Sequence, residues 1–197
     1  STDLSFIVAQ NGIVENYLEL KKELVKQNYV FHTQTDTEVI VRLIEEKLTQ
    51  TKNLIQAVRS AFVELEGRNT IIILTKEGQI IAARNGSPLV IGTNDSEIYF
   101  SSDTLSFAPF VKEIIVLDNG QMVSCMDSKL HIQNILTGSP VKYVPEKNTI
   151  KDSTVHKGKY PHFMIKEIFD TPFTINQVIK QKKQDLLAFA SAIKKAK

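Results

Sequence analysis

Residues 4–17 read LSFIVAQNGIVENY, a short apolar run that stops at Asn11 and Gly12. The run Leu4–Gln10 has the length and the apolar content of a buried strand. An Asn-Gly pair is a common turn signal, because both residues tolerate positive φ. This stretch therefore predicts a strand that turns at Asn11-Gly12, and the elements that follow it indicate which fold the strand joins.

Three helices are predicted directly after this strand. The first covers about residues 15–27, the second opens at Thr35 and the third begins near Asn53, each with apolar residues at helical spacing. Thr35 can cap the second helix while Glu38 reaches back to it, as in a capping box. Between the first two helices, residues 29–32 alternate like a short strand.

The pattern then changes to strands and turns. Glu77-Gly78 and Asp118-Asn119-Gly120 predict hairpin turns between neighbouring strands. Helices followed by a meander of strands indicate an α+β fold rather than a doubly wound parallel sheet. The predicted strands cover residues 70–75, 79–84, 88–91, 97–101, 113–117, 121–125 and 130–136.

The last third of the chain has a different character. Residues 137–159 are polar, include two prolines and show no periodicity, which is typical of a linker or an extended arm. Helical periodicity returns near His162, and Pro172 is expected to break or kink the first of these helical segments. We therefore predict one domain over residues 1–140 and a linker with a helical lead-in over residues 141–197.

The composition is that of a globular protein with a buried core, at 42% hydrophobic and 23% charged residues. The formal charge is only +2 and the basic residues are scattered, which argues against a nucleic-acid surface. One cysteine excludes an internal disulfide and favours the cytoplasm. No apolar run reaches the roughly 18–20 residues of a membrane helix, so no membrane contact is expected. The histidines lack metal-ligand spacing, and no cofactor is expected.

Two small features can carry chemistry. The side-chain amide of Asn11 and the backbone N–H of Gly12 can both donate to the oxyanion that forms when a nucleophile attacks an amide carbonyl. Asp36, at the start of the second predicted helix, can bind the α-ammonium group of an amino acid. Taken alone, each feature has a simpler interpretation: an ordinary turn, and an acidic residue that complements a helix dipole.

An ordered series of motifs goes beyond these single features. It closely resembles the class II glutamine amidotransferases and, within them, the glucosamine-6-phosphate synthases, from about Ile7 to Pro172. The last motif looks like the segment that joins the glutaminase domain of this branch to its sugar-isomerising domain, although the phosphoribosyl-transferring branch stays an alternative. The motifs are NGIVENY at 11–17, TDTEVI at 35–40, RNGSPLVIG at 84–92, Ser102-Asp103 and HFMIKEI at 162–168.

The resemblance implies a partial N-terminal-nucleophile hydrolase fold, an αββα sandwich, with a helical C-terminal extension. In that family an N-terminal cysteine attacks glutamine, and the released ammonia passes to fructose-6-phosphate in a second domain. Carried over by position, Asn11 and Gly12 would form the oxyanion hole, and Asp36 beside Gly12 would bind the glutamine. The turn Gly86-Ser87-Pro88-Leu89 is expected to be structural.

The sequence departs from the family where the nucleophile should be. The family's cysteine lies several dozen residues upstream of Asn11, and only ten residues precede Asn11 here. The loop that binds the glutamine carboxylate is also missing. If the first residues are extended, Ser1 lies roughly 30 Å from Asn11, too far to attack. Cys125 is expected to be a small buried hydrophobe.

Two further departures lie near the predicted oxyanion hole. Gln10 stands where the family usually has His, and residues 66–69 depart from a small-aromatic pattern. The Gln10 substitution puts full activity in doubt even if a nucleophile were supplied.

Two functional hypotheses follow. In the first, the chain is part of the glutaminase domain of a glucosamine-6-phosphate synthase and is inactive alone. Its partners would be glutamine, a missing N-terminal nucleophile segment and a missing sugar isomerase domain, and the isolated chain would form homo-oligomers or be poorly soluble. In the second, the chain is a non-catalytic amidotransferase-like module that binds an amino acid or serves as a scaffold.

Overall fold

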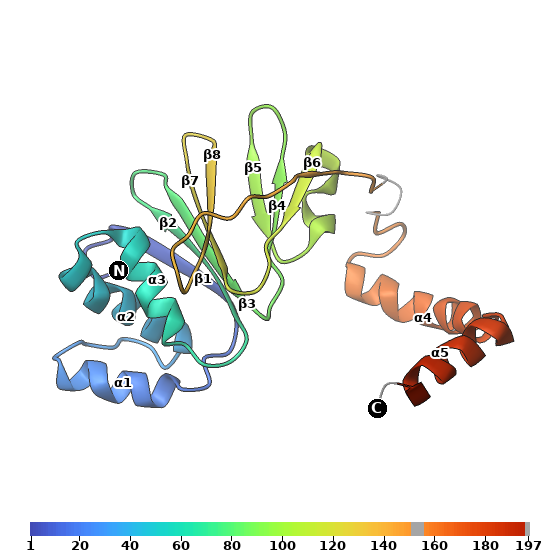
Figure 1. Ribbon diagram of the computed structural model, residues 1–197, viewed down its shortest axis with the longest axis horizontal. Coiled ribbons are helices and arrows are strands. Elements are labelled where there is room, and N and C mark those ends of the chain that lie inside the picture. The colour runs from blue at the N-terminus through green and yellow to red at the C-terminus, as the bar shows by residue number, and fades with distance from the viewer. Residues whose placement is uncertain (151–155, 196–197) are drawn as a thin grey trace. The chain divides into compact units, whose positions relative to one another are not determined.

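Two antiparallel sheets form the first unit of the chain, Ser1–Asp152, in a computed structural model that describes residues 1–150 and 156–195 (Figure 1). Sheet A has the order β1 (Phe6–Gly12), β2 (Asn69–Thr75), β3 (Ile80–Asn85), β7 (Gln121–Met126) and β8 (Lys129–Asn134). Sheet B has the order β5 (Ile98–Ser101), β4 (Val90–Thr93), β6 (Glu113–Val116) and β9 (Glu146–Lys147).

Three helices cover one face of sheet A, as Figure 1 shows: α1 (Tyr17–Lys26), α2 (Asp36–Thr51) and α3 (Leu54–Val63). Their apolar faces pack on the side chains of β1 and β2 that point toward them. Burial of these side chains is the main force that holds the helices on the sheet. The fully buried members of this core include Leu24, Ile40, Ile44, Val58, Ile71 and Ile73.

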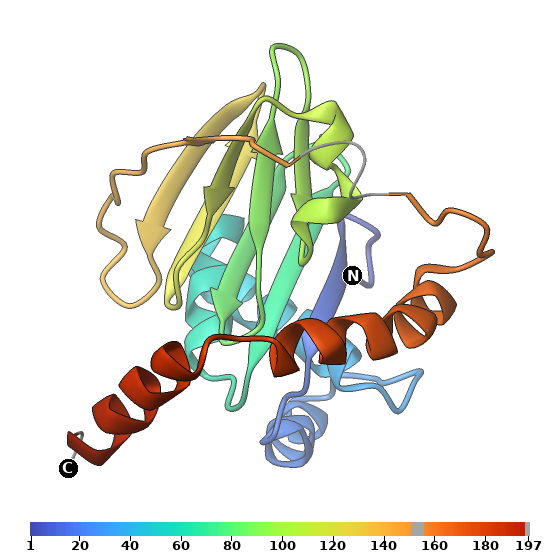
Figure 2. The same cartoon turned by 90° about the vertical axis from the view of Figure 1, so that its right-hand side faces the viewer.

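A second core lies between the two sheets. Sheet A contributes Ala82, Val123 and Ile132 to this core. Ile91 of β4 and Leu89, the residue before β4, pack against them. The other face of sheet B carries a smaller cluster and two short 3₁₀ turns, η1 (Thr104–Ser106) and η2 (Ala108–Phe110). The described layers are therefore helices, sheet, sheet and 3₁₀ turns, seen from a second side in Figure 2.

The predicted turn at Asn11-Gly12 was wrong. Both residues continue β1, which pairs with β2 as far as Gly12 opposite Asn69. The strand also begins later than predicted, because Leu4 has a φ of +58° and residues 1–5 fold back onto it. The N-terminal ammonium of Ser1 donates a 2.8 Å hydrogen bond to the carbonyl oxygen of Phe6.

The region between α1 and α2 also differs from its prediction. Residues 29–32 form no strand, and their alternation arises because Tyr29 and Phe31 pack on the helix-side core. Thr35 caps α2 as predicted, accepting from the N–H of Glu38. The Glu38 carboxylate does not reach back to Thr35. It accepts instead from the backbone N–H groups of His32 and Thr33.

The two predicted hairpin turns had different outcomes. Glu77-Gly78 joins β2 to β3 as an antiparallel pair, as predicted. The prediction of a hairpin at residues 118–120 was wrong, because β6 before this turn belongs to sheet B and β7 after it belongs to sheet A. It is a crossover between the two layers, and the side chain of Leu117 before it is completely buried. In the polar stretch after β8, β9 pairs with β6 at the edge of sheet B.

In the second unit, Ser153–Lys197, the described residues 156–195 form two helices, α4 (Phe163–Ile179) and α5 (Lys183–Lys195). Pro172 does not break α4, which continues to Ile179, although proline has no N–H to donate to the preceding turn. Neither helix has a buried residue. None of the described helices is long and apolar enough to cross a membrane.

Candidate functional site

The N–H of Gly12 points away from the sheet. In the ladder of β1 and β2, Ser5 accepts from Lys76 and Ile13 donates to Arg68, so the odd-numbered residues of β1 face β2. The even-numbered residues, including Gly12, therefore point their N–H groups to the open edge of β1. Within the described residues the Gly12 N–H has no acceptor.

Only glycine fits at position 12. Its φ is +144°, and a Cβ built there would lie 2.0 Å from the carbonyl oxygen of Arg68 and 2.9 Å from the Cα of Asn69. The close approach of β2 and the left-handed backbone both exclude a side chain. The missing side chain also leaves the N–H of Gly12 open on its outer side.

The Asn11 side chain is exposed at the same strand end. Since side chains alternate along a strand, it lies on the face of sheet A opposite to Gln10 and the helices. Its amide has no partner in the part of the chain that the structure describes. Both predicted oxyanion donors are therefore available at the end of β1. Their role stays a prediction.

Asp36 is the first residue of α2 and is half-buried. Its Oδ2 accepts hydrogen bonds from the N–H of Val14 (2.9 Å) and from Nε2 of Gln10 (3.1 Å). Among the described residues nothing donates to Oδ1. One carboxylate oxygen is therefore fixed by the protein, and the other can accept from a cationic group. Acidic residues are favoured in the first turn of a helix, where they complement the helix dipole.

Gln10 connects Asp36 to two other side chains. Its Oε1 accepts from Oγ1 of Thr37 at 2.6 Å, and its Nε2 donates to Oδ1 of Asn69 at 2.9 Å as well as to Asp36. Asn69 is 1% exposed and donates through Nδ2 to the carbonyl oxygens of Ile13 (3.0 Å) and Glu66 (3.3 Å). The sequence showed positions 10 and 69 only as separate departures, and it showed Thr37 only as part of the motif at residues 35–40, without a role.

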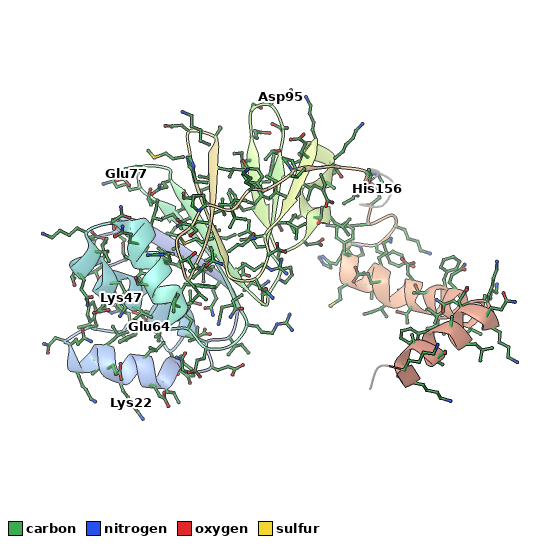
Figure 3. The ribbon with its side chains drawn as sticks, viewed as in Figure 1. Lys22, Lys47, Glu64, Glu77, Asp95 and His156 are labelled. Carbon is green, nitrogen blue, oxygen red and sulfur yellow. The ribbon has the colours of Figure 1, made fainter. Side chains whose placement is uncertain are left out.

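An ion pair holds α2 against α3 and so helps to fix the helix that carries Asp36. Nζ of Lys47 lies 2.6 Å from Oε1 of Glu64, and Figure 3 shows the two side chains together where α3 ends. Burial lowers the pKa of Lys47, but the ion pairs with Glu64 and Glu46 outweigh burial and raise the pKa above its usual value. Lys47 is therefore firmly charged at neutral pH.

Ser1 is held far from the candidate site. It is hydrogen-bonded to Phe6, and Asn11 lies five strand steps further on, which is about 17 Å. The predicted separation of roughly 30 Å was too long, because it assumed an extended N-terminus whereas residues 1–5 fold back. The remaining distance still excludes Ser1 as the nucleophile of this site.

Cys125 is not a nucleophile for the site either. It lies in β7, is 7% exposed and is a free thiol. Burial raises the pKa of its thiol, which keeps it protonated and unreactive at neutral pH. The prediction that Cys125 is a small buried hydrophobe is therefore confirmed.

The remaining residues singled out in the sequence have other surroundings. His32 and His131 are exposed, and the described residues contain no group of three or more His, Cys, Asp or Glu that could hold a metal. The carbonyl oxygen of Ser87 accepts from Thr70 at 2.7 Å and from Arg84 at 3.0 Å, which fits a structural turn.

A cavity of about 390 Å³ lies at the opposite end of β1 from Asn11. Thr2, Ser5, Phe6 and Glu45 contribute to its lining. Because of this position, the cavity is not part of the candidate site. Asn11, Gly12 and Asp36 lie at the other end of β1.

A model of the glutamine amidotransferase domain matches residues 1–109. Three similar curated proteins are all glutamine–fructose-6-phosphate aminotransferases (isomerizing). That of Acinetobacter baylyi is 37% identical and aligns with 97% of this chain and 32% of its own length. Those of Thermococcus kodakarensis and Bacteroides thetaiotaomicron are 34% and 38% identical and align with 95% and 91% of this chain. The chain spans about a third of the length of these relatives.

The fold also has counterparts among solved structures. The glutamine phosphoribosylpyrophosphate amidotransferase from B. subtilis, complexed with ADP and GMP, superposes with a TM-score of 0.61 at 25% identity, covering 70% of this chain and 30% of its own. A structure described as the allosteric regulatory enzyme of purine biosynthesis gives 0.59 at 24% identity, covering 67% of this chain and 29% of its own. These similarities confirm the predicted fold class.

Proposed function

Because the chain belongs to the glutamine amidotransferase domain family, we propose that it supplies the oxyanion donors and the ammonium anchor of a glutamine-hydrolysing site. The observation that carries this proposal is the arrangement at the end of β1. Asn11 and Gly12 keep two donors available there, and Asp36, bonded to Val14 two residues further on, keeps one carboxylate oxygen available.

Each group has a distinct task in the proposed reaction. Attack on the side-chain amide of glutamine creates a negatively charged oxygen, to which the Asn11 amide and the Gly12 N–H donate. Oδ1 of Asp36 binds the α-ammonium group and so holds the substrate in one orientation. Pre-placed donors of this kind each contribute a factor of about 10²–10³ to the rate.

The nucleophile is proposed to come from a segment outside these 197 residues. The open edge of β1 supports strand addition at this place, because the outward N–H groups of Val8, Gln10 and Gly12 can pair with another strand. Next to that edge, Ile7 and Leu74 are 61% and 42% exposed, which provides apolar surface for an added strand to cover.

The activity of the whole protein is part of the same proposal. Its relatives are about three times as long, and we infer that ammonia released at this site converts fructose-6-phosphate to glucosamine-6-phosphate in a sugar isomerase domain. Residues 141–197 would then be the linker and helical lead-in to that domain. With this activity we also propose a role in cytoplasmic amino sugar biosynthesis, toward UDP-GlcNAc, and we expect homo-oligomers.

The direct test is reconstitution. The chain is mixed with the upstream segment that carries the cysteine, and ammonia release from L-glutamine is measured. We expect hydrolysis by the mixture, none by either part alone, and none when Asp36→Ala is used. A folded complex that releases no ammonia would overturn the proposal.

A second candidate is a non-catalytic module that binds an amino acid. It is favoured by Gln10 in place of the family's usual His and by the lack of a suitable nucleophile among the described residues. Calorimetry of the chain with glutamine and glutamate separates the two candidates. Binding that Asp36→Ala abolishes, in a protein that stays inactive after reconstitution, would support this module.

A further inference from the structure

Gln10 and Asn69 are 59 residues apart in the sequence and directly hydrogen-bonded. Both lie where the sequence departs from the pattern of the family it resembles. We propose that these two amides form a matched pair of positioning residues that orients Asp36 toward the ammonium group of the ligand. This inference rests on the proposed function, because it assigns a role to the surroundings of the proposed ammonium anchor.

The orientation of the Asn69 amide is determined by its partners. Nδ2 donates to the carbonyl oxygens of Ile13 and Glu66, which can only accept. Oδ1 must therefore point toward Gln10. Since Asn69 is almost completely buried, a rotated amide would turn its oxygen toward both carbonyl oxygens and take from the Ile13 carbonyl the side-chain donor it has here, at considerable cost.

Asn69 in turn determines how the Gln10 amide lies. Nε2 of Gln10 faces two oxygens that accept, Oδ1 of Asn69 and Oδ2 of Asp36, while Oε1 faces the hydroxyl of Thr37. In a rotated Gln10 amide, Oε1 would face Oδ1 of Asn69 and Oδ2 of Asp36, and neither contact would have a hydrogen to share. Asn69 and Thr37 therefore determine the orientation of the Gln10 amide, and Gln10 in turn helps to fix the carboxylate of Asp36.

The consequence for Asp36 is that one oxygen is occupied and the other is left available. Gln10 and Val14 both donate to Oδ2. Rotation of the carboxylate would break both bonds, so they keep Oδ2 facing the protein, and among the described residues no group donates to Oδ1. The pair acts on the ligand through Asp36, so it should affect substrate binding more than the chemical step.

The test measures glutamine hydrolysis by the reconstituted complex of the full chain and the nucleophile-bearing segment. In Gln10→Glu, a carboxylate of nearly the same shape replaces both donors with acceptors beside Asp36. We expect KM for glutamine to rise at least tenfold while kcat changes less than twofold, because ground-state and transition-state binding of the ammonium group are lost equally. Gln10→His, which keeps one donor, should restore most of the affinity.

Gln56→Glu is the matched control, since it makes the same change on the exposed face of α3 and should leave KM and kcat unaltered. A purely structural role for Gln10 would instead lower the melting temperature and reduce activity without changing KM. An unchanged KM in Gln10→Glu, in a complex that Asp36→Ala inactivates, would overturn this inference alone. A wild-type complex that hydrolyses no glutamine would overturn the proposed function and this inference with it.

Discussion

The backbone N–H of Val14 donates a 2.9 Å hydrogen bond to Oδ2 of Asp36, 22 residues further along the chain. Val14 is completely buried, so this bond ties the segment that follows β1 to the first turn of α2. Asp36 therefore has a structural partner on one oxygen and an available site on the other. Substitutions can separate the two roles.

Asp36→Asn should weaken glutamine binding while it retains most of the fold. An asparagine can still accept from Val14 through its side-chain oxygen, but it no longer carries the charge that attracts the ligand. Hydrogen bonds to charged groups contribute about 1.5–3 kcal/mol, which corresponds to a roughly 10- to 150-fold weaker affinity for glutamine. Isothermal titration calorimetry on the reconstituted complex measures this change.

The comparison with Asp36→Ala shows whether the two roles are distinct. Alanine also removes the acceptor for the N–H of Val14. The free energy of unfolding of Asp36→Ala should therefore be about 1 kcal/mol lower than that of Asp36→Asn. Equal glutamine affinity in wild type and Asp36→Asn would show that this carboxylate does not bind the ammonium group.

Gly12→Ala should destabilise the end of β1 strongly. The new Cβ would lie 2.0 Å from the carbonyl oxygen of Arg68 at a φ of +144°. Strain and overpacking together predict a loss of about 3 kcal/mol in the free energy of unfolding. Gly78→Ala is the matched control, because Gly78 also has positive φ (+87°) but nothing lies within 4 Å of its Cβ position.

Urea denaturation of both variants measures the difference. Gly78→Ala should cost only about 1 kcal/mol. Similar losses in the two variants would mean that backbone strain alone, rather than the contact with β2, makes position 12 intolerant of a side chain.

The sequence predicted the elements that depend on local patterns. α2 and α3 begin within a residue of their predicted starts, because Thr35 and Asn53 are strong caps and each accepts from the N–H three residues later. The hairpin of β2 and β3 was also predicted from its turn and its alternation. These features are encoded within a few residues of each other.

The errors arose where partners are distant in sequence. Asn11-Gly12 has the composition of a turn, but pairing with Thr70 and Asn69 extends β1 through it. Residues 118–120 have the composition of a hairpin turn, yet the strands before and after them belong to different sheets. The bond between Gln10 and Asn69 could not be predicted for the same reason, since no local pattern joins positions 59 residues apart.

Glu38 should make the stability of the first unit depend on pH. Burial raises the pKa of its carboxyl, but hydrogen bonds from Thr33, from the N–H of His32 and from Arg42 outweigh burial and lower the pKa from 4.5 to about 2. A carboxyl whose pKa is lower in the folded state stabilises the protein above its unfolded pKa. That contribution is lost as the pH falls from about 5 to about 2.

This contribution to stability is at most about 3.5 kcal/mol, because each unit of pKa shift corresponds to about 1.4 kcal/mol. Glu38→Gln should remove this part of the pH dependence and lower stability at pH 7, since glutamine cannot pair with Arg42 as an anion. Denaturant titrations between pH 7 and pH 3 measure both effects. Parallel pH profiles for wild type and Glu38→Gln would contradict the assignment to this residue.

The apolar side chains of α4 and α5 should drive self-association of the isolated chain. Met164, Phe169, Phe173 and Ile179 of α4 are each more than 60% exposed, as is Phe189 of α5. Exposed apolar surface of this extent favours contact with another apolar surface. A protein of residues 1–150 should therefore sediment as a monomer, whereas the full chain should associate as its concentration rises.

Removal of this second unit should leave the first unit intact, because the buried core residues belong to the first unit and the helices α4 and α5 contain no buried residue. We expect its melting temperature to change by no more than about 2 °C, since a loss of 1 kcal/mol would shift it by about 2–8 °C. Phe169→Ser with Phe173→Ser in the full chain should reproduce the monomer without a deletion. If residues 1–150 associate as strongly as the full chain, the surface that drives association is instead the open edge of β1, with Ile7 beside it. An Ile7→Lys substitution should then restore the monomer.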